Sequence, residues 1–158
     1  MSDTPDTALE GGTDLPEWEW SRTVENSDAV GVGDTVTFSK EITDDDVTSF
    51  ARASGDTNPL HLEDEYAAET RFGGRIAHGM LVGGLISAAL ARFPGTVVYL
   101  SQEFEFKGPV GIGDRATAEV EVVDTLDGGR YRLSTQVLVA DEVVIDGEAV
   151  VLIDEEPA

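Results

Sequence analysis

The sequence predicts an α+β domain in which a curved antiparallel β-sheet wraps one long, buried helix. Two patterns indicate this class. Residues 78–92 are apolar on nearly every side, which is typical of a buried helix and not of an amphipathic surface helix. Strand-like segments separated by turn residues then follow one another to the C-terminus, as in an antiparallel meander. A chain of 158 residues without internal repeats suits one domain of this kind.

The composition restricts the class of protein. A hydrophobic fraction of 41% can supply a core, but no apolar run approaches the roughly 20 residues that a membrane span needs. The first residues lack both the basic and the apolar region of a secretory signal. The absence of cysteine excludes disulfides and disfavours zinc sites, so we expect no metal. We therefore expect a soluble, cytoplasmic protein without a membrane partner.

The net charge of −22 is extreme, with 32 acidic residues against ten basic ones. Such a field repels nucleic acid, whose binding requires lysine and arginine to displace counterions, so we expect no nucleic-acid partner. A well-solvated surface is one explanation for this charge. The magnitude favours another, adaptation to the salt-rich cytosol of a halophile, where the Debye length shrinks to about 3 Å and self-repulsion is screened.

The N-terminal segment differs from the rest of the chain. Residues 1–28 are acidic and show little periodicity, so we expect a flexible extension there and a domain over residues 29–158. Trp18 and Trp20 are candidates for docking on that domain, because large aromatic side chains are costly to leave in water.

The first half of the domain reads as one strand and two short helices. Residues 36–39 alternate as a strand does, and Thr43 is placed to cap a helix that ends near residues 54–55. A loop over residues 56–61 and a short helix over residues 63–69 follow. Further along, the helix at residues 78–92 precedes four expected strands, at about residues 96–107, 115–125, 130–140 and 142–153, with Asp127-Gly128-Gly129 as a hairpin turn.

The segment from Asp56 to His61 carries the main chemical signal. Asn58-Pro59 keeps this segment out of a continuous helix, so Asp56 and His61 can converge on one point. A carboxylate and an imidazole that share one water can activate it and return a proton to a substrate. In a purely structural alternative, Asp56 caps the following turn and His61 is a packed side chain.

Gly79 adds a second part to this candidate site. At the start of the buried helix its N–H has no intrahelical partner and lies at the positive end of the helix dipole. Without a side chain, Gly79 lets a ligand reach the backbone, where a developing oxyanion would be stabilised. The alternative is a glycine needed only for close packing. We expect His78, just before it, to have a structural role at the helix entrance.

These residues resemble the MaoC-like (R)-specific enoyl-CoA hydratases. The resemblance rests on Gly55-Asp-Thr-Asn-Pro-Leu-His-Leu62, on Ile76-Ala-His-Gly-Met-Leu81 with Ser87, and on Phe104-Glu-Phe-Lys-Gly-Pro-Val110, and it extends from about residue 30 to the end. It implies a hot-dog fold, usually paired into a homodimer, and reversible addition of water to a trans-2-enoyl-CoA to give an (R)-3-hydroxyacyl-CoA. Fatty-acid oxidation and polyhydroxyalkanoate supply both use this step.

The resemblance assigns roles position by position. Asp56 and His61 match the dyad that activates water, and Gly79 matches the backbone donor to the thioester oxygen. Ser87 matches a pocket serine that supports the dyad or the substrate; a small residue tolerated in a packed helix is its alternative. Asn58 matches an orienting asparagine, and a simple Asn-Pro turn explains it equally well.

The expected acyl-CoA substrate leads to further expectations about cofactors, phosphate contacts and acyl length. Coenzyme A belongs to the substrate, so no separate cofactor is expected, and Arg71, Arg75 and Lys107 are candidates to face its phosphates. Acyl length is open, with Val82, Gly83 and Leu85 as candidate tunnel residues. A hot-dog thioesterase, a 3-hydroxyacyl-thioester dehydratase running the reverse reaction, and a non-catalytic binding module are the alternative functions.

Overall fold

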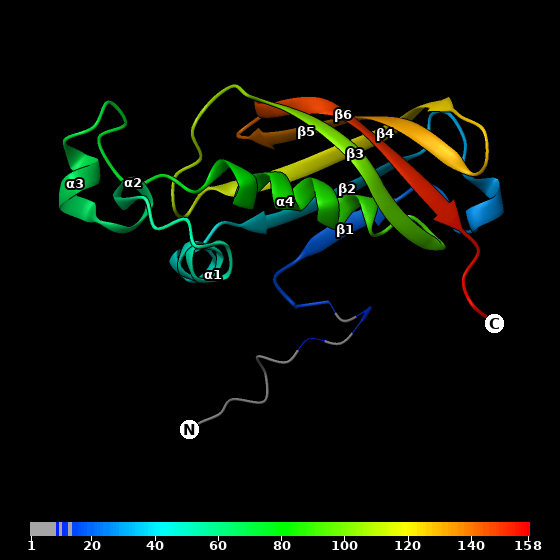
Figure 1. Cartoon of the computed structure of the whole chain (residues 1–158), viewed down its shortest axis with the longest axis horizontal. Helices are drawn as coiled ribbons and strands as arrows, with labels where there is room; N and C mark the ends of the chain where they lie inside the picture. Colours follow the sequence, from blue (N-terminus) through cyan, green and yellow to red (C-terminus); the bar gives the residue numbers. More distant parts are fainter. Residues whose placement is uncertain (1–8, 10, 13) are drawn as a thin grey trace.

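The computed structural model describes residues 9, 11–12 and 14–158, and over these residues it is a single curved sheet around one helix (Figure 1). The sheet is antiparallel throughout, and its strand order is β1-β2-β4-β5-β6-β3. The strands are β1 (Glu19–Arg22), β2 (Thr35–Glu41), β3 (Thr96–Phe106), β4 (Arg115–Thr125), β5 (Arg130–Val139) and β6 (Glu142–Asp154). The helices are α1 (Asp44–Ser54), α2 (Pro59–Leu62), α3 (Asp64–Ala68) and α4 (Gly79–Leu90), with a 3-10 turn at Ser27–Ala29.

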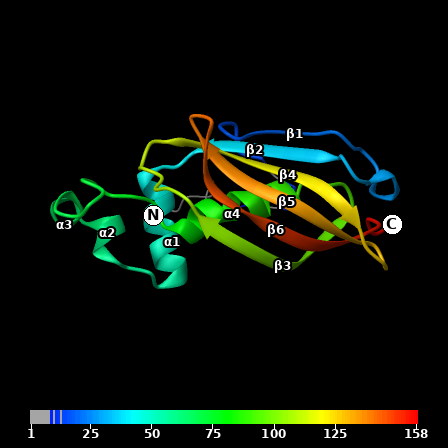
Figure 2. The ribbon, with the colours of Figure 1, turned by 90° about the horizontal axis from the view of Figure 1, so that it is seen from above.

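The core lies between α4 and the concave face of the sheet (Figure 2). On β4 every second residue from Ala116 to Val122 is buried, so that one face of the strand is apolar and packs on the helix. Val82 and Ile86 of α4 are buried against this face. The predicted α+β class, with a long helix wrapped by a curved antiparallel sheet, is confirmed. Among the helices described, α4 included, none combines the length and hydrophobicity that crossing a membrane requires.

One stripe of α4 is not covered, although the sequence predicts a helix buried all round. Met80 is 57% exposed, and Gly84 and Ser87 are also exposed. These positions are four and three residues apart and therefore lie on one side of the helix. The sheet curves over the opposite side, so a single chain leaves this stripe open next to β3.

The helices α1, α2 and α3 lie together beyond one end of the sheet (Figures 1 and 2). The Thr43 hydroxyl accepts a hydrogen bond from the Asp46 N–H, and the Asp46 carboxylate accepts one from the Thr43 N–H, which completes the predicted capping box of α1. Gly55 ends α1 with a φ of 83°, a left-handed conformation that favours glycine. The expected loop at residues 56–61 contains a helical turn, α2, because Asn58 caps it and Pro59 occupies its first position.

The structure corrects the expectation of a flexible extension over residues 1–28 for part of that segment. Glu19–Arg22 form the edge strand β1 and pair with β2. The Trp18 ring packs edge-on against Phe38, with 5.6 Å between the ring centroids. Four residues without an apolar alternation give too weak a signal for a strand, and β2 supplies the pairing that creates it. The rest of that expectation includes residues outside the described ranges.

Candidate active site

A cavity of about 720 Å³ opens between the α1–α3 region, the start of α4 and the end of β3. Asp56, His61, His78 and Gly79 all border it. Most of its remaining wall is apolar, as expected for a pocket that accepts an acyl chain with a few polar groups to orient it. Its apolar wall includes Phe50, Phe72, Val82, Phe106, Val110 and Ile145.

Asp56 reaches this cavity from the turn between α1 and α2. Its Oδ1 accepts a hydrogen bond of 3.2 Å from the Asn58 N–H, and the residue is exposed. A carboxylate oxygen of Asp56 lies within 4.8 Å of a ring nitrogen of His61. One water with hydrogen bonds of about 2.8 Å to each group can bridge that separation. Asp56 therefore caps the following turn, as in the structural alternative, and also borders the cavity within reach of His61 through one water.

His61 is held in one tautomer by the backbone. Its Nδ1 lies 2.7 Å from the Ile76 carbonyl oxygen, and only 8% of the residue is exposed. Because a carbonyl only accepts, Nδ1 carries the hydrogen and Nε2 keeps its lone pair. A neutral imidazole in this tautomer is a proton acceptor at Nε2, which is the property a general base needs.

Gly79 occupies the first position of α4, with its N–H at the positive end of the helix. The Phe106 ring covers it closely: a Cβ added at residue 79 would lie 2.7 Å from Phe106 Cε1. Only glycine allows this approach without a shift of the ring. Phe106 is itself 54% exposed and borders the cavity, so the backbone donor lies beside an aromatic wall that a ligand can contact.

His78 lies between the Asp56–His61 pair and Gly79. Its Nε2 donates a 3.0 Å hydrogen bond to the Asp56 carbonyl, and its ring is stacked on the His61 ring with 4.0 Å between the centroids. The Phe50 ring packs on it at 4.8 Å. Only 1% of His78 is exposed. The side chain therefore fixes Asp56 and His61 relative to Gly79, which agrees with the expected structural role at the helix entrance.

Asp56, His61 and His78 also form a group of three metal-ligand types. Their donor atoms lie within 4.8 Å of one another, whereas neighbouring ligands of a tetrahedral zinc are roughly 3.3 Å apart. The two imidazole rings are tilted by 32° relative to each other, with 4.0 Å between their centroids.

Two residues assigned by resemblance lie elsewhere. The Asn58 side chain caps α2 by accepting a 3.1 Å bond from the Leu60 N–H, which corresponds to the turn alternative. Ser87 is exposed and borders a separate hollow with Tyr99 and Gln102. Eight residues of helix separate it from Gly79, about 12 Å along the axis, so within one chain α4 carries it away from the dyad.

The basic residues also separate into two groups. Arg71 and Lys107 border the cavity, as candidates for phosphate contacts should. The Lys107 ammonium lies 2.8 Å from the Glu105 carboxylate, which raises the pKa of Lys107 and lowers that of Glu105. Arg75 differs, because its guanidinium bonds to the protein itself. Of the proposed tunnel residues, Val82 borders the main cavity and Gly83 the hollow beside Ser87.

Sequence reasoning gave no role to Phe106 and none to the Ile76 carbonyl. The alternation in Phe104-Glu105-Phe106 is a usable signal for the aromatic wall, because it places both rings on one face of the strand. The carbonyl of Ile76 has no signal in the sequence, since every residue carries one.

A family model described as a MaoC like domain matches residues 28–144. The chain belongs to the MaoC-like family. A 3-hydroxybutyryl-CoA dehydratase of Methylorubrum extorquens is 50% identical over 123 residues, which cover 76% of this chain and 78% of that protein. An (R)-specific enoyl-CoA hydratase of Rhodospirillum rubrum is 44% identical, over 77% of this chain and 86% of the relative.

Solved structures agree with this membership. The unliganded R-hydratase PhaJ1 of Pseudomonas aeruginosa superposes with a TM-score of 0.78 at 41% identity, over 87% of this chain and 90% of the other. The predicted hot-dog fold of this MaoC-like domain is thereby confirmed.

Proposed function

We propose that this chain is an (R)-specific enoyl-CoA hydratase, a hydro-lyase that adds water reversibly to a trans-2-enoyl-CoA. One observation carries the proposal: an acid and an imidazole lie within 4.8 Å of each other beside a free helix N-terminus, in one largely apolar cavity. The relatives named as hydratase and dehydratase support the same reversible reaction. The same site serves hydration and dehydration, because a catalyst accelerates both directions of a reaction equally.

The proposed mechanism assigns one task to each group. Water between Asp56 and His61 gives a proton to the dyad while its oxygen bonds to C3 of the enoyl group. The C2=C3 electron pair moves toward the thioester, and the Gly79 N–H stabilises the negative charge on the thioester oxygen. The dyad then returns a proton to C2, which gives the (R)-3-hydroxyacyl-CoA. Coenzyme A is part of the substrate, so the proposal assigns no separate cofactor.

Hydration of crotonyl-CoA tests this function. We expect the conjugated enoyl absorbance to fall without release of free thiol, and a chiral assay of the product to give the (R) form. Asp56→Asn and His61→Gln should each lower kcat by about 10²-fold or more, because each removes a proton-transfer group. Wild-type rates in both variants would contradict the assignment of the dyad.

The same assay distinguishes the alternative functions. Release of free thiol with the enoyl absorbance retained indicates a thioesterase. If neither change occurs, the protein is a binding module.

Arg71→Met should raise KM for crotonyl-CoA with little change in kcat, because Arg71 borders the cavity as a proposed phosphate contact and takes no part in proton transfer. A cytoplasmic location stays a prediction from the sequence.

We further propose that the chain forms a homodimer through α4 and β3. The stripe of Met80 and Ser87 on α4 lies open, and β3 is an edge strand whose one partner among the described strands is β6. β3 also exposes Val98, Tyr99 and Leu100. A second copy related by a two-fold axis covers both features, because an antiparallel edge can pair with itself.

The mass in solution tests the homodimer. Light scattering after gel filtration should give about twice the chain mass of 16.8 kDa. Leu100→Lys places a charge in the proposed interface and should yield monomers, whereas Val123→Lys, at an exposed position on β4, should remain dimeric. A wild-type monomer at high micromolar concentration contradicts the proposal.

A further inference from the structure

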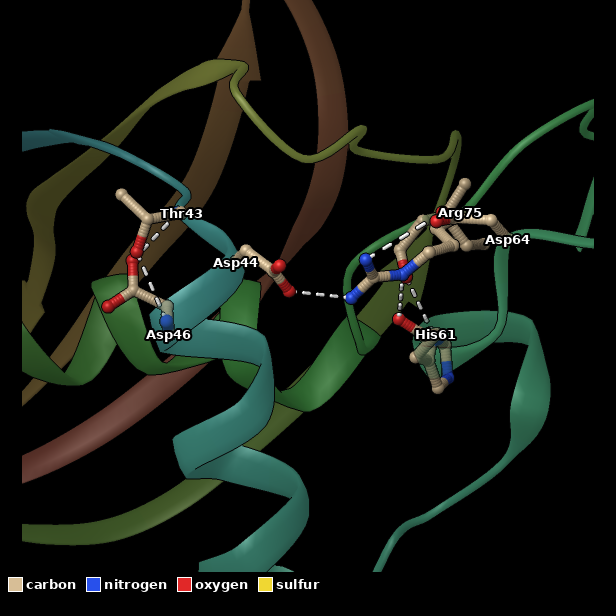
Figure 3. A network of polar contacts seen from close by, with 7 residues as sticks. Thr43, Asp44, Asp46, His61, Asp64 and Arg75 are labelled. Atoms are coloured by element: carbon tan, nitrogen blue, oxygen red, sulfur yellow. Dashed lines mark hydrogen bonds and ion pairs between the residues drawn. The ribbon is translucent and has the colours of Figure 1, made fainter.

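Arg75 lies between the three helices beyond the sheet, with its side chain only 14% exposed. Its Nε donates a 2.7 Å hydrogen bond to the His61 carbonyl oxygen, and its Nη2 donates one of 2.7 Å to Asp44 Oδ1 (Figure 3). Its Nη1 lies 3.8 Å from Asp64 Oδ1. One guanidinium therefore connects the first turn of α1, the carbonyl of His61 in α2 and the first turn of α3.

Ile76, the residue after Arg75, holds the imidazole of His61. The Ile76 carbonyl accepts the Nδ1–H of the imidazole, while the Arg75 side chain binds the His61 backbone. This pair of residues is itself anchored to the loop after β3. Ile76 forms an antiparallel bridge with Gly111, and the Ala77 N–H donates a 2.7 Å bond to the Val110 carbonyl. His61 is thus held at its backbone and its ring by one fixed segment.

The helices that carry His61 need such a connection. α2 has four residues and α3 has five, and helices this short have no stability of their own. They lie beyond the end of the sheet (Figure 1), where Leu62 of α2 packs against the core and Ala67 of α3 is buried, so few apolar contacts hold them. A planar guanidinium holds a carbonyl and two carboxylates with donors in a fixed fork, whereas the three donors of a lysine share one nitrogen and cannot spread over the same distance.

Two alternative roles for Arg75, a phosphate ligand and a purely structural ion pair, agree less well with these contacts. A phosphate ligand should present its donors to the cavity, but the Arg75 donors are bonded to His61 and Asp44, and Arg71 is the arginine that borders the cavity. A purely structural ion pair should affect folding and leave the imidazole unchanged. The contact with His61 indicates a role that includes the imidazole.

We propose that Arg75 is the positioning residue of the general base. By fixing the His61 backbone over the Ile76 carbonyl, Arg75 keeps the imidazole as its Nδ1–H tautomer with Nε2 directed at the reacting water. This inference rests on the proposed hydratase function for its kinetic part, and on the structure alone for its tautomer part.

The kinetic test uses Arg75→Met, with Arg52→Met as a control of equal charge change. Arg52 is exposed in the last turn of α1 and lies outside the cavity lining. Arg75→Met should lower kcat about 10- to 100-fold and leave KM within about twofold, because misplacement of a reacting group by about 1 Å costs rates of that order. Arg52→Met should have the wild-type kcat and KM.

The tautomer test uses long-range ¹⁵N–¹H spectra of the imidazoles at a pH where both are neutral. The chain has two histidines, so the spectrum contains only His61 and His78. In the wild type, His61 should show one protonated nitrogen, Nδ1, and one unprotonated nitrogen, Nε2. In Arg75→Met the two His61 shifts should move toward each other as the tautomers mix, while the Arg52→Met spectrum should match the wild type.

Each outcome decides the proposal. A wild-type kcat or an unchanged His61 spectrum in Arg75→Met overturns it, and so does an effect confined to KM, which would indicate a phosphate contact. If Arg75→Met does not fold, Arg75→Lys provides both readings, since it keeps the charge without the fork. If the wild type does not hydrate crotonyl-CoA, the proposed function fails, and the ¹⁵N comparison still tests Arg75.

Discussion

His78 illustrates at the scale of one residue how the site is assembled. The sequence predicts a structural role for it at the entrance of α4, and in the structure its ring contacts Asp56, His61 and Phe50. Nε2 donates to the Asp56 carbonyl, and the ring faces His61 and Phe50. The Nδ1 atom is buried and unpaired among the described residues, so the bond from Nε2 to Asp56 is the polar contact that the ring makes there.

We predict that the hydrogen bond from His78 matters more for rate than for stability. His78→Phe keeps an aromatic ring but loses the donor to Asp56, so kcat should fall about tenfold while the free energy of unfolding falls by only about 1 kcal/mol. His78→Gln, whose amide can replace the donor, should retain a higher kcat than His78→Phe. Steady-state kinetics and urea unfolding measure both quantities. Equal kcat values in the two variants would show that the donor is unimportant.

At the scale of the element, α1 supports the site through its first turn. The capping box of Thr43 and Asp46 fixes where α1 begins, and Asp44, the first residue of the helix, is the carboxylate that binds Arg75. Lys40 lies 2.6 Å from Asp46 and joins the same turn to β2. The N-terminus of α1 is therefore tied to the sheet through Lys40 and, as Figure 3 shows, to the segment that holds His61 through Asp44 and Arg75.

We predict that loss of this cap destabilises the fold. Thr43→Ala removes the side-chain acceptor for the Asp46 N–H and should lower the free energy of unfolding by about 0.5–2 kcal/mol. Thr43→Ser keeps the acceptor and should remain within about 0.5 kcal/mol of the wild type. Urea unfolding followed by far-UV circular dichroism gives both values. A Thr43→Ala protein as stable as Thr43→Ser would contradict the capping role.

The elements also show which parts of the structure a sequence can predict. The four C-terminal strands and α4 lie close to their expected ranges, because alternation and all-round hydrophobicity come from the residues themselves. The sequence does not predict β1, because that strand depends on pairing with β2. It does not predict α2 either, because that helix is a single turn. At the site, the cavity contains the expected dyad and Gly79, whereas the roles of Arg75 and Ile76 depend on contacts that only the fold creates.

At the scale of the whole molecule, the charge is the dominant feature. The net charge is −22, and acidic residues oppose each other even within the sheet. Glu103 pairs with Glu148 and Glu105 with Asp146 across β3 and β6. Like charges directly opposite each other destabilise a sheet, so screening should stabilise this fold.

We predict that the melting temperature rises by several degrees between about 0.1 M and 2 M NaCl, because the Debye length falls from about 10 Å to below 3 Å. Glu103→Gln removes one repulsive pair, so it should raise the melting temperature in low salt more than in high salt. Differential scanning calorimetry gives the four values. A wild-type melting temperature that is independent of salt would contradict adaptation to a salt-rich cytosol.

The docking of the N-terminal edge strand has a consequence for spectroscopy. The two tryptophans of the chain are Trp18 and Trp20, and the Arg92 guanidinium lies 5.5 Å and 5.8 Å from their ring centroids. Arg92 also bonds to the Ala88 carbonyl at the end of α4. Tryptophan fluorescence therefore reports on the contact between the β1 region and the C-terminal end of α4. This is the opposite end of that helix from Gly79. If the emission changes before the circular dichroism signal is lost, β1 dissociates from the sheet before the core unfolds.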